Sequence, residues 1–140
     1  MSGCRVLIID DDRDDGGFLT EALAQSGVNS IHHVYTVMQA FIYLEALEPT
    51  YLPKLIITDH YLPGIKGTEF LKDLKGMDKY KQIPVIVLST ITTSGEIEKY
   101  KGMGALDYVD KPSTYAEYFE LAAEMKRKAD LVQDEPGDSA

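Results

Sequence analysis

Short, continuous runs of aliphatic residues constrain the fold of this chain more than any other feature of its sequence. They occupy residues 6–9, 55–57 and 85–88, and a weaker run follows at 106–109. A strand with one exposed face alternates apolar and polar residues, whereas a strand covered on both faces is apolar throughout. The runs therefore predict buried parallel strands, and the more polar residues 30–35 predict a strand at the edge of the sheet.

Helical patterns lie between these runs. An amphipathic helix repeats its apolar residues at spacings of three and four. The stretches with this repeat are residues 18–23, 37–47, 70–74 and 115–125. Thr93 and Thr114 each stand three residues before a glutamate, the spacing of a capping box at a helix start. Strand and helix alternate five times, which predicts a doubly wound α/β sandwich with right-handed crossovers.

The composition indicates a single acidic domain. The 140 residues fit one domain, expected at 1–129, with a disordered acidic tail at 130–140. The formal net charge of −9 disfavours nucleic acid and anionic membranes as partners, because both are negatively charged. No apolar run approaches the roughly 20 residues of a membrane span, and the N-terminus lacks a signal-peptide pattern. The single cysteine, Cys4, cannot form an internal disulfide and fits a reducing cytoplasm, where we expect the protein.

Polar side chains follow the predicted strands where each strand ends. In an open parallel sheet the carboxyl ends of the strands meet at one edge, and ligands bind there. The residues in question are Asp10, Asp11 and Asp12 after the first run, Asp59 after the second, Ser89 and Thr90 after the third, and Lys111 after the fourth. The sequence thus predicts that carboxylates, hydroxyls and an ammonium group gather at a single edge.

This combination of groups is suited to phosphoryl chemistry. Crowded carboxylates repel one another and need a cation to stay ionised. Oxygen ligands without a histidine or cysteine cluster favour Mg²⁺ over Zn²⁺, and Mg²⁺ keeps open positions for phosphate oxygens. An ammonium group and a hydroxyl stabilise phosphoryl charge, and a carboxylate can itself accept the group as an aspartyl phosphate.

Motifs in fixed order point to one family. They are Val-Leu-Ile-Ile-Asp10-Asp11-Asp12, Leu-Ile-Ile-Thr-Asp59-x-x-Leu62-Pro63-Gly64-x-x-Gly67, Ile83-Pro84-Val-Ile-Val-Leu-Ser89-Thr90 and Gly104-Ala105-x-x-Tyr108-Val-x-Lys111-Pro112. With these motifs the chain resembles the receiver domain of two-component response regulators, the CheY-like superfamily, over roughly residues 4–128. The resemblance implies a flavodoxin-like (βα)5 sandwich, whose five-stranded parallel sheet has the strand order 2-1-3-4-5.

The resemblance also implies an acceptor and a metal site. Asp59 would accept the phosphoryl group. Mg²⁺ would be coordinated by Asp11, by Asp59 and by the backbone carbonyl of Tyr61, and Asp10 would hold a water molecule of the metal. The domain would catalyse only its own phosphorylation and dephosphorylation.

The same resemblance implies roles for Ser89, Tyr108 and Lys111. Ser89 would hydrogen-bond the phosphoryl group, Lys111 would pair with one of its oxygens, and the peptide before Pro112 would be cis. Ser89 and Tyr108 would form a switch, because the hydroxyl is drawn to the added charge and the aromatic ring swings into the space left behind.

The partners implied are proteins. A sensor histidine kinase or a histidine phosphotransfer protein would donate the phosphoryl group, and a downstream protein would read the switched surface. That surface would comprise the fourth helix, the fifth strand and the fifth helix, which is also where a homodimer would form. With nearly the whole chain assigned to the receiver, we expect a stand-alone single-domain regulator.

Two other functions stay open at this point. An aspartyl-nucleophile phosphatase would need a second carboxylate two residues after Asp59, where this chain has Tyr61. A pseudo-receiver binding module would lack the acids or the lysine, whereas this chain keeps Asp10, Asp11 and Lys111.

The sequence also predicts where the first helix begins and how two features near the acidic residues are arranged. Gly16 and Gly17 weaken the first turn of the first helix, which we expect to begin near Phe18. Asp12, Asp14 and Asp15 are expected to form a charged turn at the helix N-terminus instead of contacting the metal. His60 is expected to face solvent from its loop.

Overall fold

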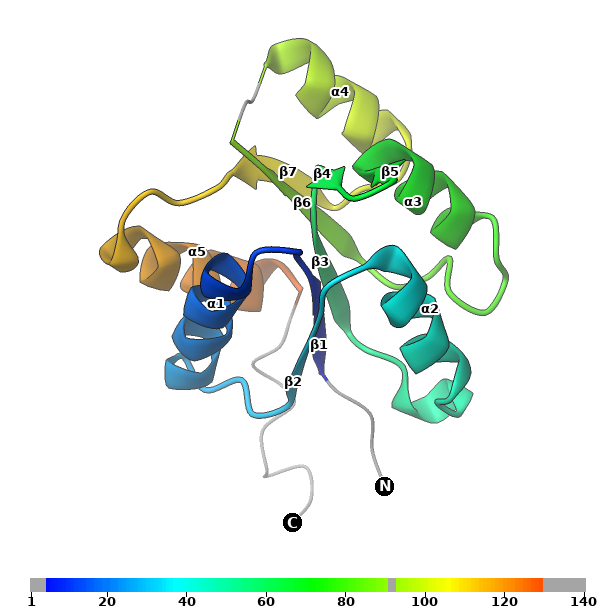
Figure 1. Cartoon of the computed structure of the whole chain (residues 1–140), viewed down its shortest axis with the longest axis horizontal. Helices are drawn as coiled ribbons and strands as arrows, with labels where there is room; N and C mark the ends of the chain where they lie inside the picture. Colours follow the sequence, from blue (N-terminus) through cyan, green and yellow to red (C-terminus); the bar gives the residue numbers. More distant parts are fainter. Residues whose placement is uncertain (1–4, 91–92, 130–140) are drawn as a thin grey trace.

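Parallel strands form the central sheet of the computed structural model, which describes residues 5–90 and 93–129 (Figure 1). The sheet has five strands in the order β2-β1-β3-β6-β7. They are β1 (Val6–Ile9), β2 (Ile31–Val34), β3 (Leu55–Asp59), β6 (Val85–Ser89) and β7 (Asp107–Asp110). The order confirms the predicted 2-1-3-4-5 arrangement, since β4 (Tyr61–Leu62) and β5 (Ile65–Lys66) form a separate antiparallel pair.

Helices cover both faces of the sheet, which confirms the predicted doubly wound sandwich (Figure 1). One face carries α1 (Arg13–Gln25) and α5 (Tyr115–Lys128), and the other carries α2 (Val37–Glu45), α3 (Gly67–Lys75) and α4 (Ser94–Gly102). A 3-10 helix, η1 (Pro49–Tyr51), precedes β3. Thr93 and Thr114 cap α4 and α5 as predicted, each accepting a hydrogen bond from the backbone N–H three residues later, at 3.2 Å.

Two separate cores explain why the strands are apolar throughout. Successive residues of a strand point to opposite faces of the sheet. Val6 and Ile8 therefore pack with residues of α1 and α5. Leu7 and Ile9 pack with residues of α2 and α3, and all these strand side chains are at most 1% exposed. Burying an aliphatic side chain contributes about 1.5–3 kcal/mol, so a polar residue on either face would weaken one layer.

The first helix begins earlier than the sequence suggested. It starts at Arg13 and not near Phe18, because Asp12 caps it. The Asp12 carboxylate accepts hydrogen bonds from the backbone N–H groups of Asp14 and Asp15 at 2.9 and 3.0 Å. A side-chain cap is worth about 1 kcal/mol, comparable to the cost of a glycine in a helix. The charged N-terminal turn predicted for Asp12 is thus confirmed, and the cap offsets about the cost of one of the two glycines.

The glycine at position 16 has a packing role. A Cβ atom there would lie 2.1 Å from a carbon of the His33 ring, so a larger residue would force that ring to move. The same ring places Nε2 2.9 Å from the backbone oxygen of Asp10. Gly16 therefore lets α1 approach the sheet closely enough for His33 to reach the end of β1.

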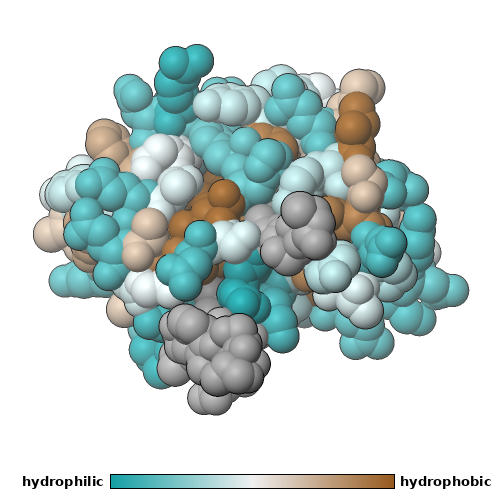
Figure 2. All heavy atoms as spheres, turned by 90° about the horizontal axis from the view of Figure 1, so that it is seen from below, coloured by the Kyte–Doolittle hydropathy of each residue, from teal (hydrophilic) through white to brown (hydrophobic). Residues whose placement is uncertain are grey.

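The surface opposite the carboxyl ends of the strands is mainly polar. Figure 2, the view from below Figure 1, shows hydrophilic side chains predominating there, with smaller hydrophobic areas between them. Within residues 5–90 and 93–129 no helix combines the length and apolarity needed to cross a membrane. The predicted tail at 130–140 and the cysteine Cys4 lie outside the described residues.

Asp107, the first residue of β7, joins β7 to two helices. It is 7% exposed, accepts a hydrogen bond from Lys128 of α5, and lies 3.6 Å from the Nζ of Lys101 in α4. Burial alone would raise the pKa of Asp107. The hydrogen bonds from Lys128 and from the backbone N–H of Tyr108 act the other way and lower it below its ordinary value of 3.8.

The Asp107→Asn substitution is expected to lower the free energy of unfolding by about 1–2 kcal/mol at pH 7. The pKa of Asp107 in the folded state lies below 3.8. The stabilisation that its carboxylate provides is therefore present above pH 3.8 and is lost as the pH falls through the folded-state pKa. In urea unfolding, the free energies of unfolding of the variant and the wild type should become more alike as the pH is lowered from 7 to 3. Asp78→Asn, which alters a 95% exposed carboxylate, is the control. A difference that does not change with pH would contradict the ionic role of Asp107.

Candidate functional site

Neighbouring strands deliver the predicted site residues to one edge of the sheet. Asp10 follows β1, Asp59 ends β3, Ser89 ends β6 and Lys111 follows β7. These strands are adjacent and parallel, in the order β1-β3-β6-β7. Their carboxyl ends therefore lie side by side, at the upper end of the sheet in Figure 1. The structure thus brings together residues that are far apart in the sequence.

The ammonium group of Lys111 lies among three carboxylates. Its Nζ is 3.1 Å from Asp10 Oδ2, 3.1 Å from Asp59 Oδ2 and 3.0 Å from Asp15 Oδ2. The Lys111 side chain is 8% exposed, and those of Asp10 and Asp59 are 5% and 11% exposed. The backbone N–H of Lys111 donates to the carbonyl of Ser89 at 2.8 Å, which fixes this end of β7 against β6.

Burial and charge act in opposite directions within this cluster. Burial raises the pKa of Asp10 and Asp59, and the charge of Lys111 only partly offsets that effect. Burial would lower the pKa of Lys111, but its hydrogen bond to Asp15 and the charges of Asp10 and Asp59 raise it. The lysine therefore stays charged at neutral pH. One ammonium group faces three carboxylates, so the cluster retains negative charge that a divalent cation would balance.

Asp10, Asp11 and Asp59 are arranged to share a metal ion. Each offers one carboxylate oxygen, and these oxygens lie within 4.8 Å of one another. Asp10 is held in place by the backbone N–H of Asp12, which donates to its Oδ1 at 2.9 Å, whereas Asp11 is exposed to solvent. An oxygen-only donor set that is open on one side fits Mg²⁺, which keeps water ligands. The coordination by the Tyr61 carbonyl stays a prediction.

The residues predicted to form the switch are in contact. Ser89 is 0% exposed and Tyr108 is 3% exposed. Burial raises the pKa of Tyr108, while a side-chain hydrogen bond with Ser89 acts to lower it. The ring of Tyr108 therefore has an inward position in this structure, with Ser89 as its polar partner.

The sequence prediction for His60 was wrong. The residue is 7% exposed, and its Nδ1 lies 2.5 Å from the hydroxyl oxygen of Tyr100 in α4. The side chain is buried because Gly67 makes room for this contact: a Cβ at position 67 would lie 2.6 Å from the same hydroxyl oxygen. That glycine was the only sequence signal of a close approach. It could not identify the pair, since His60 and Tyr100 are 40 residues apart in the chain.

Two further observations differ from the sequence expectations. Asp15 was not among the predicted site residues, yet it contacts Lys111, and its Oδ1 accepts a hydrogen bond from the Tyr118 hydroxyl at 3.4 Å. The sequence assigned Asp15 only to the charged turn at the helix N-terminus, and nothing in the chain pairs that turn with Lys111, which lies far away in the sequence. The peptide before Pro112 is trans and not cis, since the described residues contain no cis peptide bond. Trans is the form that most X–Pro bonds adopt.

Comparison with known protein sequences identifies relatives along most of the chain. The family model for the response regulator receiver domain matches residues 6–123. The two-component response regulator ORR13 of Oryza sativa subsp. japonica is 30% identical over 117 residues, which cover 84% of this chain and 93% of that protein. ORR6 of the same organism is 33% identical over 114 residues, or 80% of this chain and 65% of that longer protein.

Solved structures agree with these relatives. The phosphorylated cyanobacterial phytochrome response regulator RcpA superposes with a TM-score of 0.77 at 27% identity, covering 89% of this chain and 92% of that one. The Mn²⁺-bound response regulator Rcp1 shares the fold, with a TM-score of 0.74 at 23% identity over 86% of this chain and 90% of that one. The chain therefore belongs to the response regulator receiver domain family, whose members here are homologues that act in two-component phosphorelay signalling.

Proposed function

We propose that this chain accepts a phosphoryl group on Asp59 in a Mg²⁺-dependent reaction and then signals by protein–protein contact. The observation that carries the proposal is the contact between Lys111 Nζ and Asp59 Oδ2, at 3.1 Å. Beside it, Asp10 and Asp11 offer oxygens that can share a cation with Asp59. A carboxylate, an ammonium group and a divalent cation together meet the charge of an incoming phosphoryl group.

Asp59 is the nucleophile in this proposal. One of its carboxylate oxygens forms a bond to phosphorus, the bond between phosphorus and the donor imidazole nitrogen breaks, and the imidazole leaves with the electron pair and takes up a proton. Asp11, Asp59 and the Tyr61 carbonyl would hold Mg²⁺ directly and Asp10 would hold it through a water molecule, and the ion would supply positive charge at the phosphoryl oxygens. Lys111 keeps its proton throughout and exchanges its contact with the carboxylate for one with a phosphoryl oxygen.

In the same proposal, Ser89 and Tyr108 respond to the negative charge of the phosphoryl group on Asp59. A phosphoryl group adds about −1.5 to −2 charges and three acceptor oxygens. The Ser89 hydroxyl donates to one of these oxygens and gives up its hydrogen bond with Tyr108. Tyr108 lies in β7, between α4 and α5 in the chain, so the change reaches the surface that these elements form.

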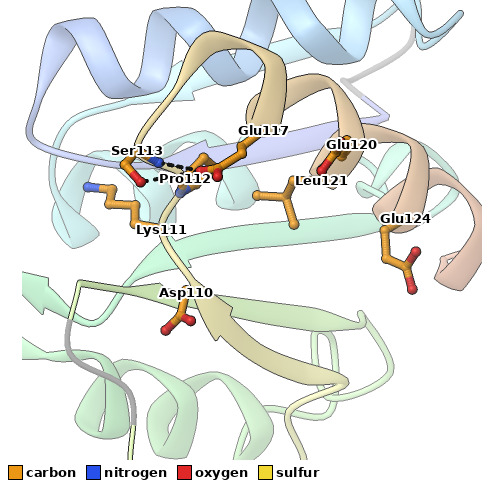
Figure 3. Close-up of a pocket in the computed structure, with 8 residues that line it drawn as sticks. All are labelled: Asp110, Lys111, Pro112, Ser113, Glu117, Glu120, Leu121 and Glu124. Atoms are coloured by element: carbon orange, nitrogen blue, oxygen red, sulfur yellow. Dashed lines mark hydrogen bonds between the residues drawn. The ribbon is translucent and has the colours of Figure 1, made fainter.

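The face formed by α4, β7 and α5 is the proposed output surface, and a homodimer would form through it. Beside the phosphoacceptor site this face has a groove of about 490 Å³ between β7 and α5 (Figure 3). Its lining residues are Asp110, Lys111, Pro112, Ser113, Glu117, Glu120, Leu121 and Glu124. Ser113 donates to Glu117 Oε1 from its backbone N–H at 2.9 Å and from its hydroxyl at 3.3 Å, which ties the loop to α5. Lys111 belongs to both the groove and the carboxylate cluster, so the two are adjacent.

The proposed donor is a sensor histidine kinase or a histidine phosphotransfer protein in the cytoplasm, where ATP supplies the phosphoryl group. A small phosphodonor can replace it in a direct test. Incubation with phosphoramidate and Mg²⁺, followed by intact-protein and peptide mass spectrometry, should show one phosphoryl group on Asp59, and EDTA should suppress it. A label at another residue would contradict the assignment. Sustained release of phosphate from a phosphomonoester would favour the aspartyl-nucleophile phosphatase instead.

Mg²⁺ is expected to stabilise the folded chain even without a phosphodonor. An ion that binds only the folded state at 100 times its Kd adds about 2.7 kcal/mol to the free energy of unfolding. Asp11→Asn removes an exposed ligand with little effect on the apo fold, so thermal unfolding of this variant should need more Mg²⁺ for the same rise in Tm. Asp14→Asn, which alters an exposed acid of the same turn, should respond as the wild type does. An unchanged Mg²⁺ response in Asp11→Asn would exclude Asp11 as a ligand.

A further inference from the structure

His60 anchors the loop that follows the phosphoacceptor. Its backbone N–H donates to the carbonyl of Leu88 at 2.8 Å, and its own carbonyl accepts from the N–H of Gly67 at 2.9 Å. Its imidazole Nδ1 lies 2.5 Å from the hydroxyl oxygen of Tyr100. The residue next to Asp59 is therefore held by β6, by the start of α3 and by a side chain of α4.

The hydroxyl of Tyr100 is fixed from two sides. It accepts a hydrogen bond from the backbone N–H of Thr68, and burial raises the pKa of Tyr100, so the phenol keeps its proton. Its second polar partner is His60 Nδ1, with which it shares one hydrogen bond. The absence of a Cβ at Gly67 leaves the space that this hydroxyl occupies.

Tyr100 also contacts the switch residue directly. Its ring stacks on that of Tyr108, with centroids 4.6 Å apart and planes 27° apart. Within α4, Tyr100 is the only buried residue, and Ile97 is partly buried against the same core. The position of α4 on the sheet therefore depends largely on this one side chain.

We propose that Tyr100 is a positioning residue for the phosphoacceptor loop, and that its hydrogen bond with His60 couples the state of Asp59 to α4. This inference rests on the proposed function of Asp59, and it describes a second connection, separate from the pair of Ser89 and Tyr108. Coupling is reciprocal: a loop held in place binds the phosphoryl group more tightly, and phosphorylation in turn changes how firmly α4 is held.

Tyr100→Phe tests the hydroxyl while keeping the stacked ring. The matched control is Tyr80→Phe, because Tyr80 is equally buried and its hydroxyl bonds Glu45, far from the site. Affinity for beryllofluoride with Mg²⁺, measured by calorimetry, should fall about threefold to tenfold in Tyr100→Phe and stay unchanged in Tyr80→Phe. Hydrogen exchange of the α4 amides should respond to beryllofluoride in the wild type and in Tyr80→Phe, but much less in Tyr100→Phe.

Variants at His60 give an independent test if Tyr100→Phe does not fold. His60→Phe removes the ring nitrogen that bonds Tyr100 and should reproduce the lower affinity, whereas His60→Asn restores a hydrogen-bonding group near Nδ1 and should recover part of it. The double variant of His60→Phe with Tyr100→Phe should be no weaker than either single variant, since one hydrogen bond is lost in all of them.

The outcomes separate the two proposals. If the wild type does not bind beryllofluoride, the proposed function fails, and this inference fails with it. If the wild type binds but Tyr100→Phe matches Tyr80→Phe in both affinity and hydrogen exchange, only the positioning role is excluded. Additive losses in the double variant would likewise show that His60 and Tyr100 act independently.

Discussion

We expect the Asp59→Asn variant to take up no phosphoryl group from phosphoramidate and Mg²⁺, a loss of at least about a thousandfold in rate. An amide has no charged oxygen with which to attack phosphorus. The substitution preserves the shape of the side chain, and it removes one carboxylate from a cluster in which three face Lys111. The folded state should therefore stay intact, and the loss of labelling would report chemistry and not unfolding.

The measurement is intact-protein mass spectrometry over a time course with both proteins. Asp14→Asn serves as the control, because Asp14 lies in the same acidic turn and its side chain is exposed. It should be labelled at the wild-type rate. Labelling that persists in Asp59→Asn would place the acceptor elsewhere and remove the basis of the proposed function.

The Lys111→Met variant is expected to lose both stability and phosphoryl transfer. Without the ammonium group, the carboxylates of Asp10, Asp15 and Asp59 face one another with no counter-charge, and Asp10 and Asp59 are largely buried. Removing one partner of a buried ion pair costs about 3–5 kcal/mol. Phosphoryl transfer should fall by about a hundredfold or more, because the lysine no longer neutralises developing charge.

The loss of stability in Lys111→Met should grow as the pH rises. Burial already raises the pKa of Asp10 and Asp59 above 3.8, and removing Lys111 raises both values further. The folded variant therefore binds protons more tightly than the unfolded chain does, and its stability falls as the pH rises through these values. In the wild type the pKa of Lys111 is raised above 10.5, so its contribution is complete at neutral pH and is lost only in strong alkali.

Urea unfolding at several pH values, with and without Mg²⁺, measures these effects. The deficit of Lys111→Met should shrink as the pH is lowered and should shrink when Mg²⁺ replaces the missing charge. Lys99→Met, which changes an exposed lysine of α4, should unfold as the wild type does. A deficit that is independent of both pH and Mg²⁺ would show that Lys111 contributes packing alone.

Much of the fold could be read from periodicity. The apolar runs identified the strands because each strand has two buried faces, as Val6 and Leu7 illustrate by packing into different cores. The start of α1 could not be read in this way. The low helix propensity of Gly16 and Gly17 predicted a later start. The cap at Asp12 and the close approach of Gly16 to His33 instead allow the helix to begin at Arg13.

The site residues likewise include some that the sequence could predict and one that it could not. Asp10, Asp59, Ser89 and Lys111 could be placed at one edge because each lies at the end of a strand, and parallel strands end together. Asp15 could not, since its reach to Lys111 depends on the helical turn that carries it.

By itself the sequence determined the layered α/β fold, the edge at which the polar groups gather and the charge that this edge carries. These follow from the alternation of buried faces along a strand and from the parallel direction of the strands. Only the tertiary structure decided which side chains meet across the layers, above all His60 with Tyr100 and Tyr100 with Tyr108. Such contacts depend on the space left between packed elements, here beside Gly67, and no local pattern in the chain encodes that space.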